Sequence, residues 1–127
     1  MVFLMWLAAC DDTEFPAIGG EGVVGDTYED VQKVFEADCY ACHGSVSPLG
    51  NLDLETDACA AIVGVMASAY AGELVVPGDS TASVLWTKMA DTKEFGGLMP
   101  PTGASAQESI DTVAAWIDLG ADCGGAR

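Results

Sequence analysis

The sequence predicts an all-α domain of four or five short helices joined by long loops. Apolar residues recur at helical spacing in several segments, whereas the period-two alternation of a half-buried strand is nearly absent. A chain of 127 residues has room for one domain of about 100 residues. Short helices with long connections bury little core of their own, so we expect a large apolar cofactor at the centre.

The helices are predicted from start signals and apolar spacing. Thr27 and Asp30 form a capping arrangement before residues on one helical face, which predicts a first helix that runs to about Asp38. Three more helices are expected: one capped by Thr56 or Asp57 that ends at Gly64, one after the turn Pro77-Gly78-Asp79, and one that begins with the capping box Ser105-Ala106-Gln107-Glu108 and ends before Gly120.

The N-terminal nine residues form an apolar run that stops at Cys10. Acidic residues follow at once, so we interpret residues 1–9 as an export signal segment. Leu7 to Cys10 resemble the lipobox of bacterial lipoproteins, in which the signal is cut before the cysteine and the cysteine is acylated. No base precedes the run, and an ordinary signal peptide is the alternative, in which Cys10 is incidental. The chain contains no run of about 20 apolar residues, so we expect no membrane-spanning helix.

Acidic residues dominate the composition. Residues 10–26 combine several acids and glycines with no base, which is typical of a flexible tether. The whole chain carries 20 acidic and 4 basic residues, a net charge of −16. This charge excludes nucleic acid as a partner, and we expect partners with a basic docking face. The alternative is that the acidity only confers solubility.

The segment Cys39-Tyr40-Ala41-Cys42-His43 follows the first predicted helix. Its spacing lets two thiols reach both vinyl groups of one porphyrin and turns an imidazole under the iron, and it is the attachment signature of c-type haem. His43 is the only histidine, so no second imidazole ligand can come from within the chain. The motif predicts one covalent haem c held by Cys39, Cys42 and His43.

The cysteine pair has three other interpretations. A thioredoxin-like dithiol would require a preceding strand and would leave His43 unexplained. A zinc site would need a fourth ligand from Cys59 or Cys123, far along the chain. A disulfide between Cys39 and Cys42 would close so short a loop that it would constrain little of the unfolded chain.

Met99 is the candidate for the sixth iron ligand. It lies in the loop before the last predicted helix, and Pro100 and Pro101 stiffen that loop. Met66 and Met89 are rivals, but both fall in or beside predicted helices, where methionine usually fills the core. Histidine and methionine ligation would raise the reduction potential and leave no open position on the iron.

Several motifs together extend beyond the haem signature: Phe35-x-x-x-Cys39-x-x-Cys42-His43-Gly44, Gly50-Asn51-Leu52-Asp53-Leu54, Val76-Pro77-Gly78-Asp79 with Ser83, Met99-Pro100-Pro101, and Trp116-Ile117-Asp118-Leu119-Gly120-Ala121. Over about residues 27–123 they resemble the class I cytochrome c family, most of all its branch common in planctomycetes and related bacteria.

This resemblance implies an all-α fold in which the first and last helices cross beside one haem. It implies thioether links at Cys39 and Cys42, with His43 proximal and Met99 distal. Phe35 and Trp116 would pack near the helix crossing. We therefore expect a cytochrome c domain at 27–123, followed by a flexible tail at 124–127.

Cys59 and Cys123 remain to be explained. Haem attachment to such a motif happens outside the cytoplasm, where disulfides persist. We expect a disulfide between these two residues, with a pair of buried free thiols as the alternative.

The functional expectation is a single-electron carrier and not an enzyme. It would be periplasmic, anchored to a bacterial membrane by a lipid on Cys10, and would serve redox partner proteins. The alternatives are a haem domain with an open sixth position that senses gas or does peroxidase-like work, and a cytochrome subunit of a dehydrogenase complex.

Overall fold

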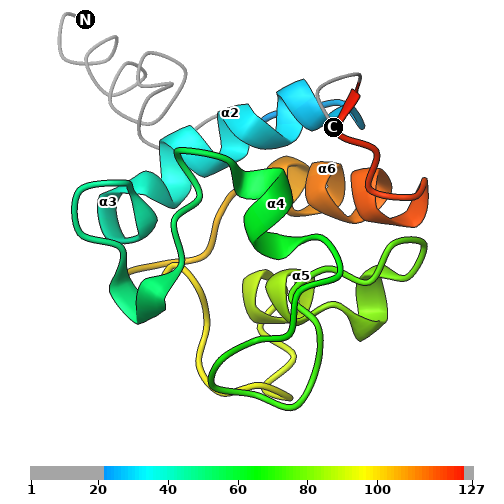
Figure 1. The fold of residues 1–127 in the computed structure, drawn as a ribbon. Coiled ribbons are helices and arrows are strands. Elements are labelled where there is room, and N and C mark those ends of the chain that lie inside the picture. The colour runs from blue at the N-terminus through cyan, green and yellow to red at the C-terminus, as the bar shows by residue number, and fades with distance from the viewer. Residues whose placement is uncertain (1–21, 125–127) are drawn as a thin grey trace, which may run out of the picture.

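The computed structural model describes residues 22–124, which fold around one helical core. Within that range it has no strand, only the isolated bridges Val63–Val75 and Met66–Glu73. The all-α prediction is therefore confirmed. The elements, in chain order, are α2 (Tyr28–Asp38), α3 (Tyr40–His43), the 3-10 turn η2 (Leu49–Asn51), α4 (Ala58–Ile62), the 3-10 turn η3 (Ser80–Ala82), α5 (Val84–Met89) and α6 (Gln107–Asp118) (Figure 1).

Helix α2 begins and ends where the sequence predicts. The Thr27 side chain accepts a hydrogen bond from the Asp30 backbone N–H, and the Asp30 carboxylate accepts one from the Thr27 backbone, which forms a capping box. Val31, Val34 and Phe35 form the buried face of the helix. Because these three residues follow helical spacing, α2 can bury one stripe while its acidic residues stay in water.

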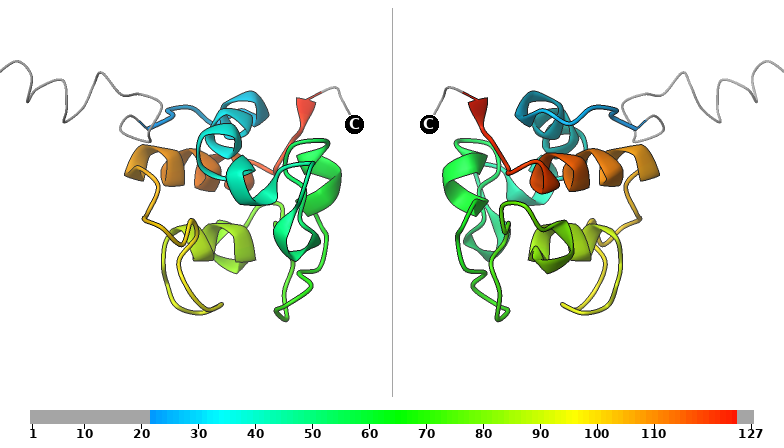
Figure 2. Two further views of the ribbon diagram at one scale, coloured as in Figure 1. Left: turned by 90° about the vertical axis from the view of Figure 1, so that its left-hand side faces the viewer. Right: turned by 90° about the vertical axis from the view of Figure 1, so that its right-hand side faces the viewer.

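Helix α2 lies across α6, and the two make the centre of the core (Figures 1 and 2). The Tyr28 and Trp116 rings lie 5.7 Å apart, and both Phe35 and Trp116 are buried. The buried apolar cluster is Val31, Val34, Phe35, Leu54, Ala58, Cys59, Ile62, Val75, Met89, Ile110, Val113, Trp116, Ile117, Ala121 and Cys123.

The two short helices of the middle region form close to the predicted places. Asp57 caps α4 by accepting from Ala60 N–H, and the helix ends at Ile62, just before the predicted end. Asp79 caps η3 and not a longer helix. The chain then turns at Ser83, from which α5 begins. The turn signal at Pro77-Gly78-Asp79 predicted a single helix, because η3 and α5 both follow it.

The capping box predicted at residues 105–108 is wrong. Helix α6 begins at Gln107 with Ala106 as its N-cap, and no side chain caps it. Ser105 lies one position too early, so its hydroxyl cannot reach the backbone N–H that a capping box would serve. The first turns of α6 are instead joined to the segment before α2: Val23 N–H donates to Ser109 Oγ at 3.0 Å.

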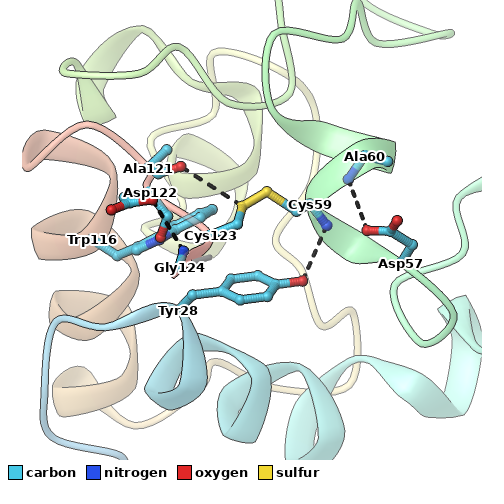
Figure 3. Close-up of a disulfide and its surroundings, with 9 residues drawn as sticks. All are labelled: Tyr28, Asp57, Cys59, Ala60, Trp116, Ala121, Asp122, Cys123 and Gly124. Atoms are coloured by element: carbon cyan, nitrogen blue, oxygen red, sulfur yellow. Dashed lines mark hydrogen bonds between the residues drawn. A yellow bond between two sulfur atoms is a disulfide. The ribbon is translucent and has the colours of Figure 1, made fainter. Parts of the chain in front are cut away.

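A disulfide joins Cys59 of α4 to Cys123 beyond α6, with the two Cα atoms 6.3 Å apart (Figure 3). The sequence left a bridge and two free thiols as alternatives, and the structure has the bridge. Beside it, Cys59 N–H donates to the Tyr28 hydroxyl at 3.1 Å. Burial raises the pKa of Tyr28. The first helix, α4 and the end of the domain therefore meet at one place.

Some predicted features lie outside the described residues. They are the export segment 1–9, Cys10, the tether up to residue 21, and the tail from residue 125 onward. Val23, which the sequence places in the tether, packs against the core. Among the helices of residues 22–124, none has the length and apolar character needed to cross a membrane.

Removal of the disulfide should destabilise the domain. The bridge joins residues 64 positions apart, and in the chain-entropy model such a closure contributes ~4 kcal/mol. We expect the double variant Cys59→Ser/Cys123→Ser to lose about that much free energy of unfolding, measured by denaturant titration of the holoprotein. Reductant should lower the wild-type value to the variant's and leave the variant unchanged. If the wild type and the double variant had the same free energy of unfolding without reductant, this account would be contradicted.

Candidate functional site

The Cys-His motif forms a single helical turn directly after α2. Cys39 N–H still bonds to Phe35 O at 2.8 Å, and His43 N–H bonds to Cys39 O at 2.8 Å. The turn α3 thus continues from the end of α2 with Cys39 between them. Cys39 and Cys42 are three residues apart in this turn, which puts their sulfurs on one side. His43 ends the turn and is half-buried.

The imidazole of His43 is oriented by a backbone carbonyl. His43 Nδ1 lies 3.0 Å from Leu49 O. Because a carbonyl can only accept, Nδ1 carries the hydrogen and Nε2 keeps a free lone pair. The carbonyl comes from the turn η2, in which Gly50 and Asn51 have φ of 65° and 61°. Glycine and asparagine tolerate this left-handed region, so the sequence permits the turn that positions the acceptor.

The backbone around His43 is held from a second direction. Leu54 N–H donates to His43 O at 2.8 Å. Ser45 N–H donates to Glu55 Oε1 at 2.9 Å. A Cβ on Gly44 would lie 2.7 Å from Tyr40 O, closer than any side chain can sit. Glycine is therefore required at position 44, where the chain continues directly after His43.

The two thiols of the motif are free, and the burial of Cys39 disfavours its thiolate form. Cys39 and Cys42 are not joined by a disulfide. Burial, with the charges of Asp38 and Cys42, raises the pKa of Cys39 to about 12. A redox-active thiol would need a lowered pKa. Within residues 22–124 no group of three or more His, Cys, Asp or Glu is placed to hold a metal ion, so a zinc site has no support.

Met99 lies in the segment between α5 and α6 and is half-buried. Its N–H donates to Lys88 O at 3.1 Å, which joins the segment to α5. In Figure 1 the turn α3 lies at the left of the molecule, whereas this yellow segment forms a loop at its lower end. The rival Met89 is 3% exposed in the core, and Met66 is 60% exposed on a loop.

A cavity of about 280 Å³ lies where α5, the end of the Met99 segment and the start of α6 meet. Leu98 and Ile110 line it together with Trp86 and Ser105. The Trp86 Nε1 and Ser105 Oγ atoms are buried and have no hydrogen-bond partner in the described part of the chain. An unpaired buried donor costs about 1–3 kcal/mol, so these two atoms are suited to a polar occupant.

A family model described as planctomycete cytochrome C matches residues 39–103, from the Cys-His turn to just past the Met99 segment. The chain belongs to this family. Comparisons with curated proteins and with solved structures gave no match. Membership implies haem c as the cofactor of this cytochrome.

The residues present fit such a group. The turn offers two free sulfurs on one side and an imidazole whose Nε2 is available. The cavity beside Met99 offers unpaired donors, and haem carries carboxylates that accept hydrogen bonds. Sequence reasoning missed the Leu49 carbonyl and the unpaired Nε1 of Trp86. The Gly50-Asn51 pair signals a turn, but no sequence pattern tells which carbonyl meets an imidazole.

Covalent attachment can be tested on the two cysteines of the turn. We expect the wild-type haem to resist extraction by acidified organic solvent, with one iron per chain. Cys39→Ser and Cys42→Ser should each leave one link, and the double variant should release the haem, because no thioether remains. Tyr40→Phe, a change in the same turn, is the control and should keep both links. Extractable haem in the wild type, or more than one iron per chain, would contradict the assignment.

Proposed function

We propose that this cytochrome transfers single electrons through one haem c, held by thioether links at Cys39 and Cys42 and by the axial ligands His43 and Met99. The hydrogen bond between His43 Nδ1 and Leu49 O is the observation that most supports the proposal. It presents Nε2, the atom an iron would require, from the same turn that carries both thiols. Haem with these ligands supplies a one-electron iron couple at a raised potential.

The protein residues position the group and limit its exposure. Leu49 and Leu54 fix the His43 ring and backbone from two directions. Met99 and the buried Met89 differ in setting: Met89 fills the core, whereas Met99 lies on a loop that Pro100 and Pro101 stiffen. A filled sixth position leaves no room for substrate, which favours electron transfer over catalysis.

Replacement of Met99 tests the ligand assignment. Met99→Ala should abolish the near-infrared charge-transfer band of the ferric protein and lower its midpoint potential, because the thioether ligand is lost. Met66→Ala, a change on an exposed loop, should leave the band and the potential unchanged. An unchanged band in Met99→Ala would refute the assignment.

Carbon monoxide separates the proposal from its alternatives. A ferrous spectrum that is unchanged by carbon monoxide supports a filled sixth position and an electron carrier. A shifted wild-type spectrum would favour the gas-sensing or peroxidase-like haem domain. A role as a subunit of a dehydrogenase complex shares the same site and differs only in its partner.

We propose that the redox partner presents a basic face. The support is the net charge of −16, to which the haem carboxylates would add. Charges separated by more than about 10 Å are screened at 0.1 M salt, so long-range attraction fades as salt rises. Electron transfer to a basic partner, measured by stopped flow, should therefore slow steeply with added salt. Rates independent of salt would contradict the proposal.

We propose a periplasmic location with a lipid anchor on Cys10. The support is the sequence alone: an apolar run, small residues before Cys10 and acidic residues after it. Mass spectrometry of the native protein should find an N-terminal Cys10 that carries acyl chains, and Cys10→Ser should release the protein from membranes. An unmodified Cys10 would refute the anchor and favour an ordinary signal peptide.

A further inference from the structure

Lys88 has an unusual environment for a base in so acidic a chain. Lys33 and Lys93 form ion pairs with Asp30 and Asp91. Among residues 22–124, Lys88 has no carboxylate within ion-pair distance, although the full chain carries 20 acids. Its ammonium group instead forms hydrogen bonds to uncharged groups.

The Lys88 side chain joins two loops. Its Nζ donates to Phe95 O at 2.8 Å and to the Tyr70 hydroxyl at 3.1 Å. The same Nζ lies 4.7 Å from the Tyr70 ring centroid. The Tyr70 and Phe95 rings meet edge to face, 5.7 Å apart. Bonds from an ionised donor are stronger than neutral ones, so this cluster is the main tie between the two loops.

The Lys88 backbone holds the same segment at its other end. Lys88 O accepts the Met99 N–H at 3.1 Å. Residues 95–99 are thus held at both ends by one residue of α5. Between these ends Gly96 has φ of 88°, and a Cβ there would lie 3.0 Å from the Tyr70 hydroxyl. The loop can approach Tyr70 this closely because the residue is glycine.

We propose that Lys88 is a positioning residue for Met99: its ammonium group holds residues 95–99 so that the methionine sulfur is presented to the iron. This inference rests on the proposed ligand role of Met99. Lys88 acts through the loop and does not itself contact the reacting atoms. Loss of the ammonium group should let the loop open more often, so an external ligand should replace Met99 faster.

The test uses the ferric holoprotein and measures the rate at which imidazole, a neutral ligand, binds the iron. We expect Lys88→Met to bind imidazole about ten-fold faster than the wild type, because a charged donor is lost but the length of the side chain is kept. Lys88→Arg retains the charge and donors and should restore most of the wild-type rate. Lys93→Met is the charge-matched control, since its side chain is 72% exposed, and should bind at the wild-type rate.

Two further variants separate the possible failures. Tyr70→Phe removes one hydrogen bond and keeps the ring, so it should raise the rate in the same direction by a smaller factor, even if Lys88→Met does not fold. Wild-type rates in both Tyr70→Phe and Lys88→Met would overturn the role of Lys88. Met99→Ala should bind fastest of all. A wild type that already binds as fast as Met99→Ala would instead overturn the ligand assignment itself.

Discussion

The packing of α2 against α6 is the contact on which the other elements depend. Phe35 on α2 and Trp116 on α6 are almost wholly removed from water, and they are the largest fully buried side chains among residues 22–124. Because α3 follows α2 with one residue between them, this packing also decides where the Cys-His turn lies. The disulfide from Cys59 joins α4 to the same centre.

The segments that carry His43 and Met99 are stabilised in different ways. His43 is held by bonds to residues within about a dozen positions, from the carbonyl of Leu49 to the N–H of Leu54. The Met99 segment is held by contacts that reach back to α5 and to the Tyr70 loop. Few contacts and long loops give low local stability. The turn that carries His43 is therefore held locally, whereas the Met99 segment depends on contacts with distant parts of the chain.

Most local signals were predicted well, and of the contacts between distant segments the sequence predicted the Cys59–Cys123 disulfide and the crossing of the first and last helices. The capping box of Thr27 and Asp30 forms as expected because both partners lie within one helical turn. The box expected from Ser105 does not form, because α6 begins one residue later and packs against Val23. Trp86 lines a cavity and its buried Nε1 has no partner in the described part of the chain, which no local pattern indicates. The role of Met99 as a ligand stays a prediction.

By itself, the sequence determined the helical class, the turn that carries Cys39, Cys42 and His43, and the family. These features depend on spacings of three or four residues, within which one helical turn acts on its own. Only the tertiary structure decided which carbonyl orients His43 and that Lys88 holds the segment before Met99 and, among residues 22–124, pairs with no acid. These contacts form between segments that are brought together only by folding, so composition and periodicity do not predict them.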